Sequence, residues 1–326
     1  MKPFIFRSVA VGVFCLFLFL VTAFPPVRAF DLKDYTNNIG LISGGIERTY
    51  DLYDPYPNIE AKRPLVIVLH GYTGSVQKIM NDNNPNRTWL DLARRERFIV
   101  AIPNGLVSAG RFKDWNDCRK DKSSKTHSDD LGFIKLLIHT LIREKNVDAK
   151  RIYVTGTSNG GHMSLRVALE APEIVAAISP VAAAMPQFSA CEFLKKPVPV
   201  LFINGTEDPL LPYEGGRVAK EAKQKHRGTV LSVENSVAWW VINNGADPRP
   251  VITDFSDHDP EDGTTARKYL YFGPAPVALI KVIGGGHTEP SLKHHYRALF
   301  LLIVGRQNKD FETAEEVWAF FKDKAR

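Results

Sequence analysis

The sequence has no internal repeat, no low-complexity linker and no segment that resembles an appended binding module. These absences exclude a repeat array and a string of tethered modules. Metal-binding patterns are also lacking. The acidic residues 254–262 do not have the regular spacing of an EF-hand loop, which favours a solvated turn, and the pair His294–His295 is too sparse for a zinc site. We therefore expect no metal ion and no organic cofactor.

A strong charge of one sign is missing as well. The chain has 42 Lys and Arg against 36 Asp and Glu, and its formal net charge is +6. Three of the surplus positive charges, Lys2, Arg7 and Arg28, lie within the first 29 residues. The basic stretch 119–125 is interrupted by Asp121, which favours a solvated loop over a nucleic-acid-binding patch. We expect no nucleic-acid partner.

A long apolar run stands at the N-terminus, from Val9 to Phe24, behind two basic residues and before Val27 and Ala29. This pattern is typical of a secretory signal peptide that is cleaved after Ala29. An uncleaved membrane anchor is the competing interpretation, but the run is short for a full span. Cys15 has no lipoprotein-type context, so no lipid anchor is expected. The sequence thus predicts a signal peptide at 1–29, a single catalytic domain at 30–326, and a secreted or periplasmic protein without a stable membrane anchor.

Cysteine is scarce, with three in the whole chain. Cys15 lies in the predicted signal peptide, which leaves Cys118 and Cys191. In an oxidising compartment an even pair favours a disulfide, and two free thiols are the alternative.

The most informative motif is residues 156–160, Gly-Thr-Ser-Asn-Gly, which follow the apolar run 151–154. A serine between glycines, after a predicted strand and before a predicted helix, fits the nucleophile elbow of an α/β-hydrolase. The helix N-terminus offers free N–H groups and a positive dipole end beside the serine oxygen, where negative charge develops during acyl transfer. The alternative is an ordinary glycine-rich turn between a strand and a helix. The motif makes Ser158 the candidate nucleophile.

Partners for this serine occur in the chain order Ser, Asp, His that such enzymes use. The apolar run 198–203 ends in a turn that contains Glu207 and Asp208. Asp208 is preferred because it precedes a proline, which biases its backbone towards an extended conformation. His287 follows the strand-like run 277–282 and three glycines, which let the backbone bring an imidazole to the serine. The sequence predicts the triad Ser158, Asp208 and His287.

A fourth element is the loop 69–75, Leu-His-Gly-Tyr-Thr-Gly-Ser, after the apolar strand 65–68. An oxyanion hole takes one backbone N–H from the residue after the nucleophile and one from a loop of this kind. These positions are Asn159 and Tyr72. His70 is expected to support the loop.

Strand-like runs alternate with helical patterns along the chain, which predicts a mostly parallel central sheet with helices on both faces. The sequence predicts strands at 46–53 and 98–103 and helices at 129–144, 159–169, 236–243 and 314–322. Ser128 is expected to cap the helix at 129–144. Trp239, Trp240 and Trp318 are expected to be core residues.

Six segments together resemble those of secreted α/β-hydrolases of the polyhydroxybutyrate depolymerase-like and feruloyl esterase-like groups, relatives of carbohydrate esterase family one. The segments are 70–75, 114–118, 129–133, 153–161, 205–213 and 284–288. The resemblance covers most of the mature chain. It implies the same triad, and it implies that Trp115 lines the substrate site. It also places residues 115–117 near the pocket, so a Cys118–Cys191 bridge would lie near the active site.

Two residues depart from the pattern of these relatives. His162 stands where methionine or another apolar residue is expected, either touching the pocket or packing behind it. Glu289 stands where many relatives have tryptophan, which would make that edge of the site more polar. Because of these two departures, the resemblance does not fix the substrate preference.

The sequence therefore predicts a secreted serine carboxylesterase that acts on short-chain, hydroxycinnamoyl or hydroxyalkanoate oligomer esters through an acyl-enzyme. The alternatives are an acyltransferase or peptidase on the same fold, and a non-catalytic secreted binding protein. The intact Ser158, Asp208 and His287 set argues against the binding protein.

Overall fold

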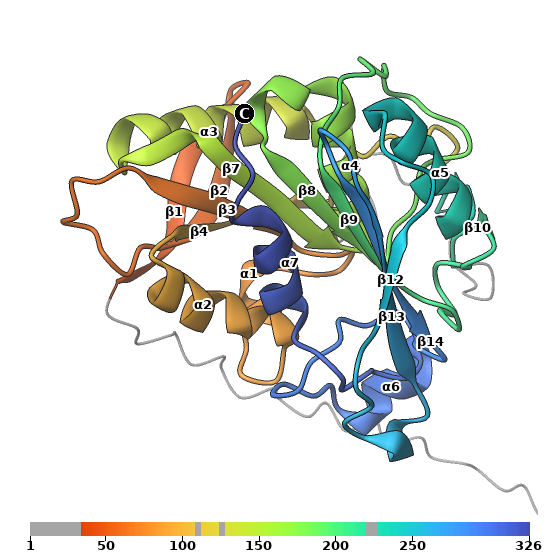
Figure 1. Ribbon diagram of the computed structural model, residues 1–326. Coiled ribbons are helices and arrows are strands. Elements are labelled where there is room, and N and C mark those ends of the chain that lie inside the picture. Colours follow the sequence, from red (N-terminus) through yellow and green to blue (C-terminus); the bar gives the residue numbers. More distant parts are fainter. Residues whose placement is uncertain (1–33, 108–111, 124–127, 220–226) are drawn as a thin grey trace, which may run out of the picture.

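The computed structural model describes residues 34–107, 112–123, 128–219 and 227–326, so the predicted signal peptide lies outside the described residues (Figure 1). Its centre is a ten-stranded sheet. In spatial order the strands are β1 (Tyr35–Ser43), β2 (Ile46–Tyr53), β4 (Ile99–Pro103), β3 (Arg63–Leu69), β7 (Val147–Thr157), β8 (Ala177–Val181), β9 (Val200–Gly205), β14 (Val277–Ile283), β13 (Thr265–Tyr271) and β12 (Val251–Asp254). The six strands from β4 to β14 in this order are parallel, and the pairs at both edges are antiparallel.

Helices cover both faces of the sheet (Figure 1). One apolar core joins the sheet to α3 (Asp130–Glu144), α4 (Asn159–Glu170) and α5 (Val233–Asn244). A second core, on the opposite face, contains α1 (Val76–Ile79), α2 (Thr88–Glu96) and α7 (Thr313–Phe321). The short helix α6 (Ala298–Val304) lies apart from both. This arrangement confirms the predicted α/β-hydrolase class, a mostly parallel sheet between two helical layers.

The central strands are mostly apolar because both of their faces are covered. Every residue of β3, β4, β8 and β9 is buried. Aromatic rings fill the second core, where Phe98 stacks on Trp318 with centroids 4.2 Å apart and Tyr153 stacks on Phe321 at 4.9 Å. Burial of such rings supplies much of the free energy that holds α7 against the sheet.

Most predicted elements match the structure within a few residues, and the cap of α3 is a correction. Asp129, not Ser128, is its N-cap, because the Asp129 carboxylate accepts a hydrogen bond from the Gly132 N–H at 2.8 Å. The Ser128 hydroxyl instead donates to Asp130 at 2.9 Å. A carboxylate is as good a cap as a hydroxyl and also suits the positive end of the helix dipole.

Small hairpins and turns complete the fold. They are β5 (Leu106–Val107) with β6 (Lys113–Asp114), β10 (Gly216–Arg217) with β11 (Thr229–Val230), and the 3₁₀ turns Pro85–Arg87, Pro172–Ile174 and Pro260–Asp262. The described ranges contain no group of three or more His, Cys, Asp or Glu side chains that could hold a metal ion. No helix within those ranges is both long and apolar enough to cross a membrane.

Candidate active site

Ser158 occupies a sharp turn between β7, which ends at Thr157, and α4, which begins at Asn159. Its φ is 58° and its ψ is −116°, a backbone conformation that L-residues rarely adopt and that stores strain. Gly160 permits this turn, because a Cβ there would lie 2.2 Å from the carbonyl oxygen of Leu69. Only a glycine lets the start of α4 approach the end of β3 so closely. The geometry is that of a nucleophile elbow.

His287 and Asp208 are paired. Asp208 follows β9 and His287 follows β14, and these neighbouring strands are parallel. The His287 Nδ1 lies 2.6 Å from one carboxylate oxygen of Asp208. The other oxygen accepts hydrogen bonds from the backbone N–H groups of Leu210 and Leu211 at 2.8 and 2.7 Å. The Asp208 carboxylate is therefore oriented by the backbone before it meets the imidazole.

Glu207, the competing acid, points elsewhere. Its side chain is 63% exposed and pairs with Arg306 at 3.3 Å, an exposed contact of little energetic value. The side chain of Asp208 is only 1% exposed. The structure thus joins His287 to Asp208 and leaves Glu207 in solvent.

The surroundings of His287 favour its protonated form. Burial by itself lowers the pKa of the imidazole, but the charge and hydrogen bond of Asp208 outweigh burial, so that the pKa is raised above 6.5. Glu289 raises this pKa further, and Arg119 opposes it. Because Nδ1 donates its proton to Asp208, Nε2 remains available as a proton acceptor.

The loop 70–75 lies beside the serine, since a Cβ on Gly71 would be 3.5 Å from the Ser158 Cβ. His70 holds this loop: its Nε2 accepts the Gly105 N–H at 2.9 Å and its Nδ1 donates to the Gly71 carbonyl at 2.8 Å. Burial lowers the pKa of His70 to about 4, so the ring is neutral at pH 7 and keeps both bonds. His70 thus supports the loop, as predicted.

The backbone N–H groups of Tyr72 and Asn159 have no acceptor among the described residues. Asn159 is the first residue of α4, where an N–H group has no partner inside the helix. The Tyr72 ring packs edge-on against Phe112, with centroids 5.6 Å apart, and the Arg227 guanidinium carbon lies 3.3 Å from the Tyr72 ring centroid. These amides are therefore available to donate to a ligand oxygen.

The resemblance implies that Trp115 lines the substrate site, but the structure places this residue in the core. Its side chain is fully buried, and its indole N–H donates to the His70 carbonyl at 2.9 Å. Its backbone N–H donates to the side-chain oxygen of Asn159 at 2.7 Å. Trp115 is a core residue that ties the loop after β3 to the start of α4.

The described part of the basic stretch, residues 119–123, also differs from the prediction of a solvated loop. Arg119 and Lys122 are each only 4% exposed. Arg119 pairs with Asp117 at 2.6 Å and Lys122 with Asp114 at 2.7 Å. Two cations offset two carboxylates in a cluster that the sequence does not indicate, because the partners come together only in the folded loop.

This charged cluster reaches the elbow. The Asn159 side chain donates to Asp117 at 2.7 Å, so the residue after Ser158 is held from the side. Burial would raise the pKa of Asp117, but Arg119 and Lys122 hold it well below its usual range, and the carboxylate stays charged. The cluster thereby keeps an ionised acceptor under Asn159 at any pH near neutrality.

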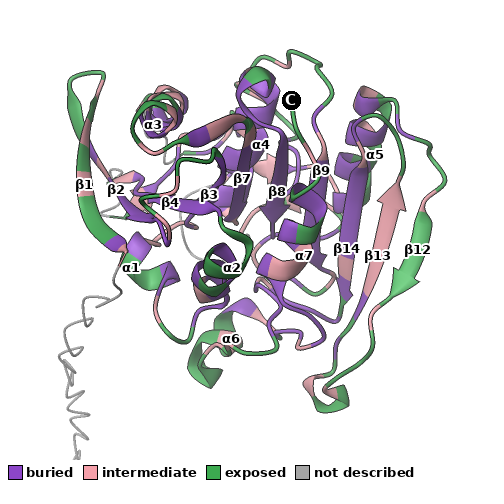
Figure 2. Cartoon of the chain, turned by 60° about the vertical axis from the view of Figure 1, so that its left-hand side comes forward, coloured by how far each residue is buried: buried purple, intermediate pink, exposed green. Residues whose placement is uncertain are grey.

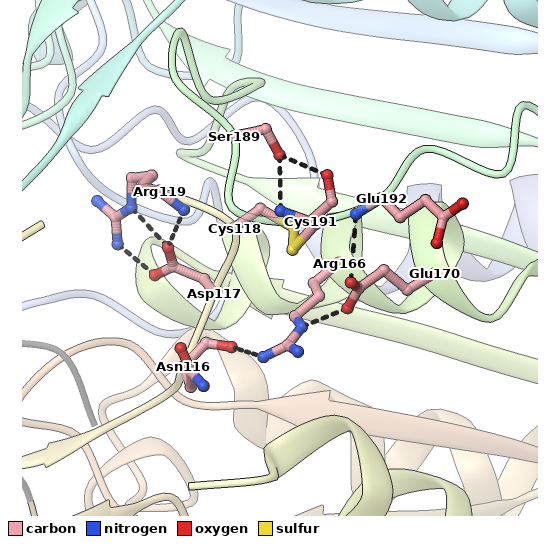
Figure 3. Close-up of a disulfide and its surroundings, with 9 residues drawn as sticks. All are labelled: Asn116, Asp117, Cys118, Arg119, Arg166, Glu170, Ser189, Cys191 and Glu192. Atoms are coloured by element: carbon pink, nitrogen blue, oxygen red, sulfur yellow. Dashed lines mark hydrogen bonds and ion pairs between the residues drawn. A yellow bond between two sulfur atoms is a disulfide. The ribbon is translucent and has the colours of Figure 1, made fainter. Parts of the chain in front are cut away.

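Cys118 and Cys191 form a disulfide, as predicted (Figure 3). It joins the loop after β6 to the segment after β8, and the Ala190 N–H also donates to the Cys118 carbonyl at 2.8 Å. The bridge lies next to Asp117, the partner of Asn159. In the same region Arg166 on α4 pairs with Glu170 at 2.7 Å (Figure 3). The disulfide therefore restrains the wall of the site around the elbow.

Replacing both Cys118 and Cys191 with alanine is expected to lower the free energy of unfolding by about 2–4 kcal/mol, because the bridge closes a loop with a sequence separation of 73. Urea unfolding followed by circular dichroism measures the loss. Cys15→Ser is the matched control and should leave stability unchanged. Thiol titration of the denatured, unreduced Cys15→Ser protein should find no free thiol, and two per chain would disprove the bridge.

Glu289, two residues after His287, is buried and is engaged by three donors. Its carboxylate accepts hydrogen bonds from Asn86 at 2.9 Å and from the hydroxyls of Thr157 and Tyr296. Because Thr157 directly precedes Ser158, this network fastens the histidine loop to the elbow. The sequence indicated Glu289 as unusual but placed it at an open polar edge. Two of its partners, Asn86 and Thr157, are far away in the chain, so only folding reveals them.

His162 packs behind the nucleophile. It is 3% exposed, and its Nδ1 lies 2.8 Å from the Ser158 carbonyl oxygen, one turn earlier in α4. Burial lowers its pKa to about 3, so the ring is neutral. Of the two positions the sequence left open, the structure selects the one behind the elbow.

Comparisons with known proteins agree with this geometry. The family model for phospholipases and carboxylesterases matches residues 57–235, more than half of the chain. Putative esterase NocK from Nocardia uniformis subsp. tsuyamanensis is 27% identical over 305 residues, 90% of this chain and 85% of that protein. Feruloyl esterase C from Emericella nidulans is 26% identical over 259 residues, 78% of this chain and 81% of that protein.

Feruloyl esterase B from Piromyces equi is 29% identical over 233 residues, 69% of this chain, and the match spans 40% of that longer protein. Among solved structures, an acetyl xylan esterase from Aspergillus awamori has the same fold, with a TM-score of 0.51 at 16% identity over 78% of this chain and 94% of that one. With the family model matching most of the parallel sheet and the elbow, the chain belongs to the phospholipase/carboxylesterase family of α/β-hydrolases and is a hydrolase that acts on ester bonds.

Proposed function

We propose that the protein is a serine carboxylesterase with Ser158 as nucleophile. His287 takes the serine proton and passes it to the leaving alcohol, and Asp208 holds the imidazole in the required tautomer. The N–H groups of Asn159 and Tyr72 stabilise the oxyanion, and water then hydrolyses the acyl-enzyme. The observation that carries the proposal is the strained Ser158 at the end of β7, on the same edge of the parallel sheet as the paired Asp208 and His287, which follow β9 and β14. Strand β8 lies between β7 and β9.

For the substrate, we propose hydroxycinnamoyl and other small carboxylic esters, with hydroxyalkanoate oligomers as the second class. The names of two relatives, feruloyl esterases B and C, support the first class. The family description, which covers carboxylesterases in general, supports the wider range of esters.

A panel of methyl ferulate, a short acetyl ester and hydroxybutyrate trimer tests the substrate class through kcat/KM. The highest kcat/KM on methyl ferulate supports the hydroxycinnamoyl class, and the highest on the trimer replaces it with the second class. Added alcohol that captures most of the acyl group would make the protein an acyltransferase. No turnover, with no labelling of Ser158 by a fluorophosphonate, would leave a non-catalytic binding protein.

We also propose that the protein is exported and that residues 30–326 are the mature domain. The basic and apolar N-terminal pattern and the Cys118–Cys191 disulfide support this, since disulfides persist in oxidising compartments. Mass spectrometry of the N-terminus of the exported protein tests it.

Glu289→Gln is expected to move the acidic limb of kcat/KM to lower pH. The imidazole must be neutral to act as base, so kcat/KM falls as the pH drops through the His287 pKa. Asp208 and Glu289 raise that pKa and Arg119 lowers it, so removing the Glu289 charge lowers it. A pH profile measured on a soluble ester gives the shift.

Glu312→Gln is the matched control for this variant. Glu312 is a buried carboxylate that accepts hydrogen bonds from Thr88, Ser291 and the Lys293 N–H, and it is not among the main groups that shift the His287 pKa. Glu312→Gln should lower the free energy of unfolding about as much as Glu289→Gln does, without moving the acidic limb of kcat/KM. If the acidic limb of kcat/KM did not move in Glu289→Gln, the role of Glu289 would be structural only.

A further inference from the structure

The helix α6 is apolar on every side and yet lies at the surface. Its sequence is Ala-Leu-Phe-Leu-Leu-Ile-Val, without one polar side chain. Leu302 is 83% exposed, Leu299 76%, Ile303 62% and Phe300 44%. Figure 2 shows α6 at the margin of the molecule, mostly exposed. A helix that is apolar all round is normally buried in a core or in lipid, and an apolar patch of this kind marks an interaction site.

The helix is attached directly to the loop that carries His287. The His287 N–H donates to the carbonyl of Val304 at 2.5 Å, and the Gly286 N–H donates to that of Arg306 at 2.8 Å. A Cβ on Gly286 would lie 2.2 Å from the Val304 carbonyl oxygen, so only glycine allows this approach. Whatever binds α6 is therefore held next to the candidate active site.

The chain segment that contains α6 carries charge of one sign. No acidic residue occurs between Glu289 and Asp310. Lys293 and Arg297, on the N-terminal side of the helix, are exposed and form no ion pair with any described residue. At the other end the exposed Arg306 pairs with Glu207 at 3.3 Å and also donates to the Gly263 carbonyl at 3.4 Å. Apolar side chains flanked by cations complement a surface that is apolar inside and anionic outside.

We propose that α6 is an interfacial helix through which the protein binds reversibly to anionic phospholipid membranes. Leu299, Leu302 and Ile303 enter the boundary between headgroups and acyl chains, and Lys293 and Arg297 contact anionic headgroups. Seven residues make a helix about 10 Å long, which fits an element lying in the plane of the interface and not one that spans a bilayer.

A second copy of the chain fits this face less well. A two-fold contact centred on α6 would bring the same cations of both copies together, which disfavours association. A helix of this length also covers much less than the roughly 800 Å² per partner of a stable interface.

Site-directed spin labelling tests the proposal on the full chain with Ser158→Ala, so that no lipid is hydrolysed. In a Cys15→Ser background, a nitroxide is placed at Leu302→Cys and, as matched control, at Ile242→Cys. Ile242 is 81% exposed on α5, far from the cationic residues in the sequence. On vesicles of phosphatidylglycerol and phosphatidylcholine the label at 302 should become immersed, and the label at 242 should stay in water. Each label reports the depth of its own residue. The result is therefore not confused if the N-terminal segment attaches the chain to the vesicles.

Vesicle partitioning gives the matching affinities. Leu302→Glu should weaken binding to the anionic vesicles by about tenfold or more. Lys293→Gln and Arg297→Gln should each weaken it by about fivefold, and Ile242→Glu should not change it. Each of these substitutions is also made in the chain that keeps Ser158. There, every variant should still hydrolyse a soluble ester, which shows that it folds.

Three results would overturn the proposal. The first is a label at 302 that stays in water on anionic vesicles. The second is equal immersion on purely zwitterionic vesicles or on a polyester film with no effect of Lys293→Gln and Arg297→Gln, which would assign the face to a neutral apolar surface. The third is concentration-dependent dimerisation that buries residue 302 without lipid. Membrane binding is measured on the Ser158→Ala chain, which has no nucleophile. A failure to bind membranes would therefore leave the proposed esterase activity untouched.

Discussion

Ser158→Ala is expected to lower kcat for a short chromogenic ester on the order of 10⁵-fold or more, because the variant can form no acyl-enzyme. The residual rate comes from the oxyanion hole and substrate binding alone. Release of p-nitrophenol from p-nitrophenyl acetate measures the loss. Thermal unfolding should change little, since the serine side chain caps nothing in α4.

Ser164→Ala is the control for this substitution. Ser164 is buried in the same helix, and its hydroxyl donates to the Gly161 carbonyl at 2.8 Å. Its loss should reduce stability by about 1 kcal/mol with turnover nearly unchanged. Near-wild-type turnover of Ser158→Ala would remove Ser158 from the role of nucleophile and end the proposed mechanism.

Asp208→Asn is expected to lower kcat by about 10⁴-fold, the second largest effect. The amide cannot accept the Nδ1 proton as a carboxylate does, so the imidazole loses the tautomer that leaves Nε2 free for the serine proton. It also loses the charge that raises the His287 pKa. The same chromogenic assay over a range of pH measures both effects.

Glu207→Gln, one residue earlier, is the matched comparison and should change kcat less than about twofold. Its exposed carboxylate contacts only the Arg306 guanidinium, a contact that contributes little. If Glu207→Gln proved the more damaging of the two, the acid of the triad would have to be reassigned to Glu207.

The interior of the sheet and the chemistry at its edge were predictable from local patterns. The central strands are buried on both faces, so they appear in the sequence as continuous apolar runs. Ser158, Asp208 and His287 each follow such a run, in turns rich in glycine or proline, and parallel strands bring their carboxyl ends to one edge. The edge strands were mostly missed. β12 is only four residues long, Val-Ile-Thr-Asp, and all four are exposed, so no alternation of apolar and polar residues marks it.

The sequence by itself determined the fold class, the elbow and the chemical identity of the candidate triad, because these depend on short-range patterns of apolar, glycine and reactive residues. Only the tertiary structure decided which carboxylate meets His287 and that Trp115 is a core residue. It also decided that Arg119 and Lys122 are buried in ion pairs and that Glu289 fastens the histidine loop to the elbow. Burial and the pairing of distant charges are properties of the packed chain, and no local pattern encodes the distance between residues such as Thr157 and Glu289.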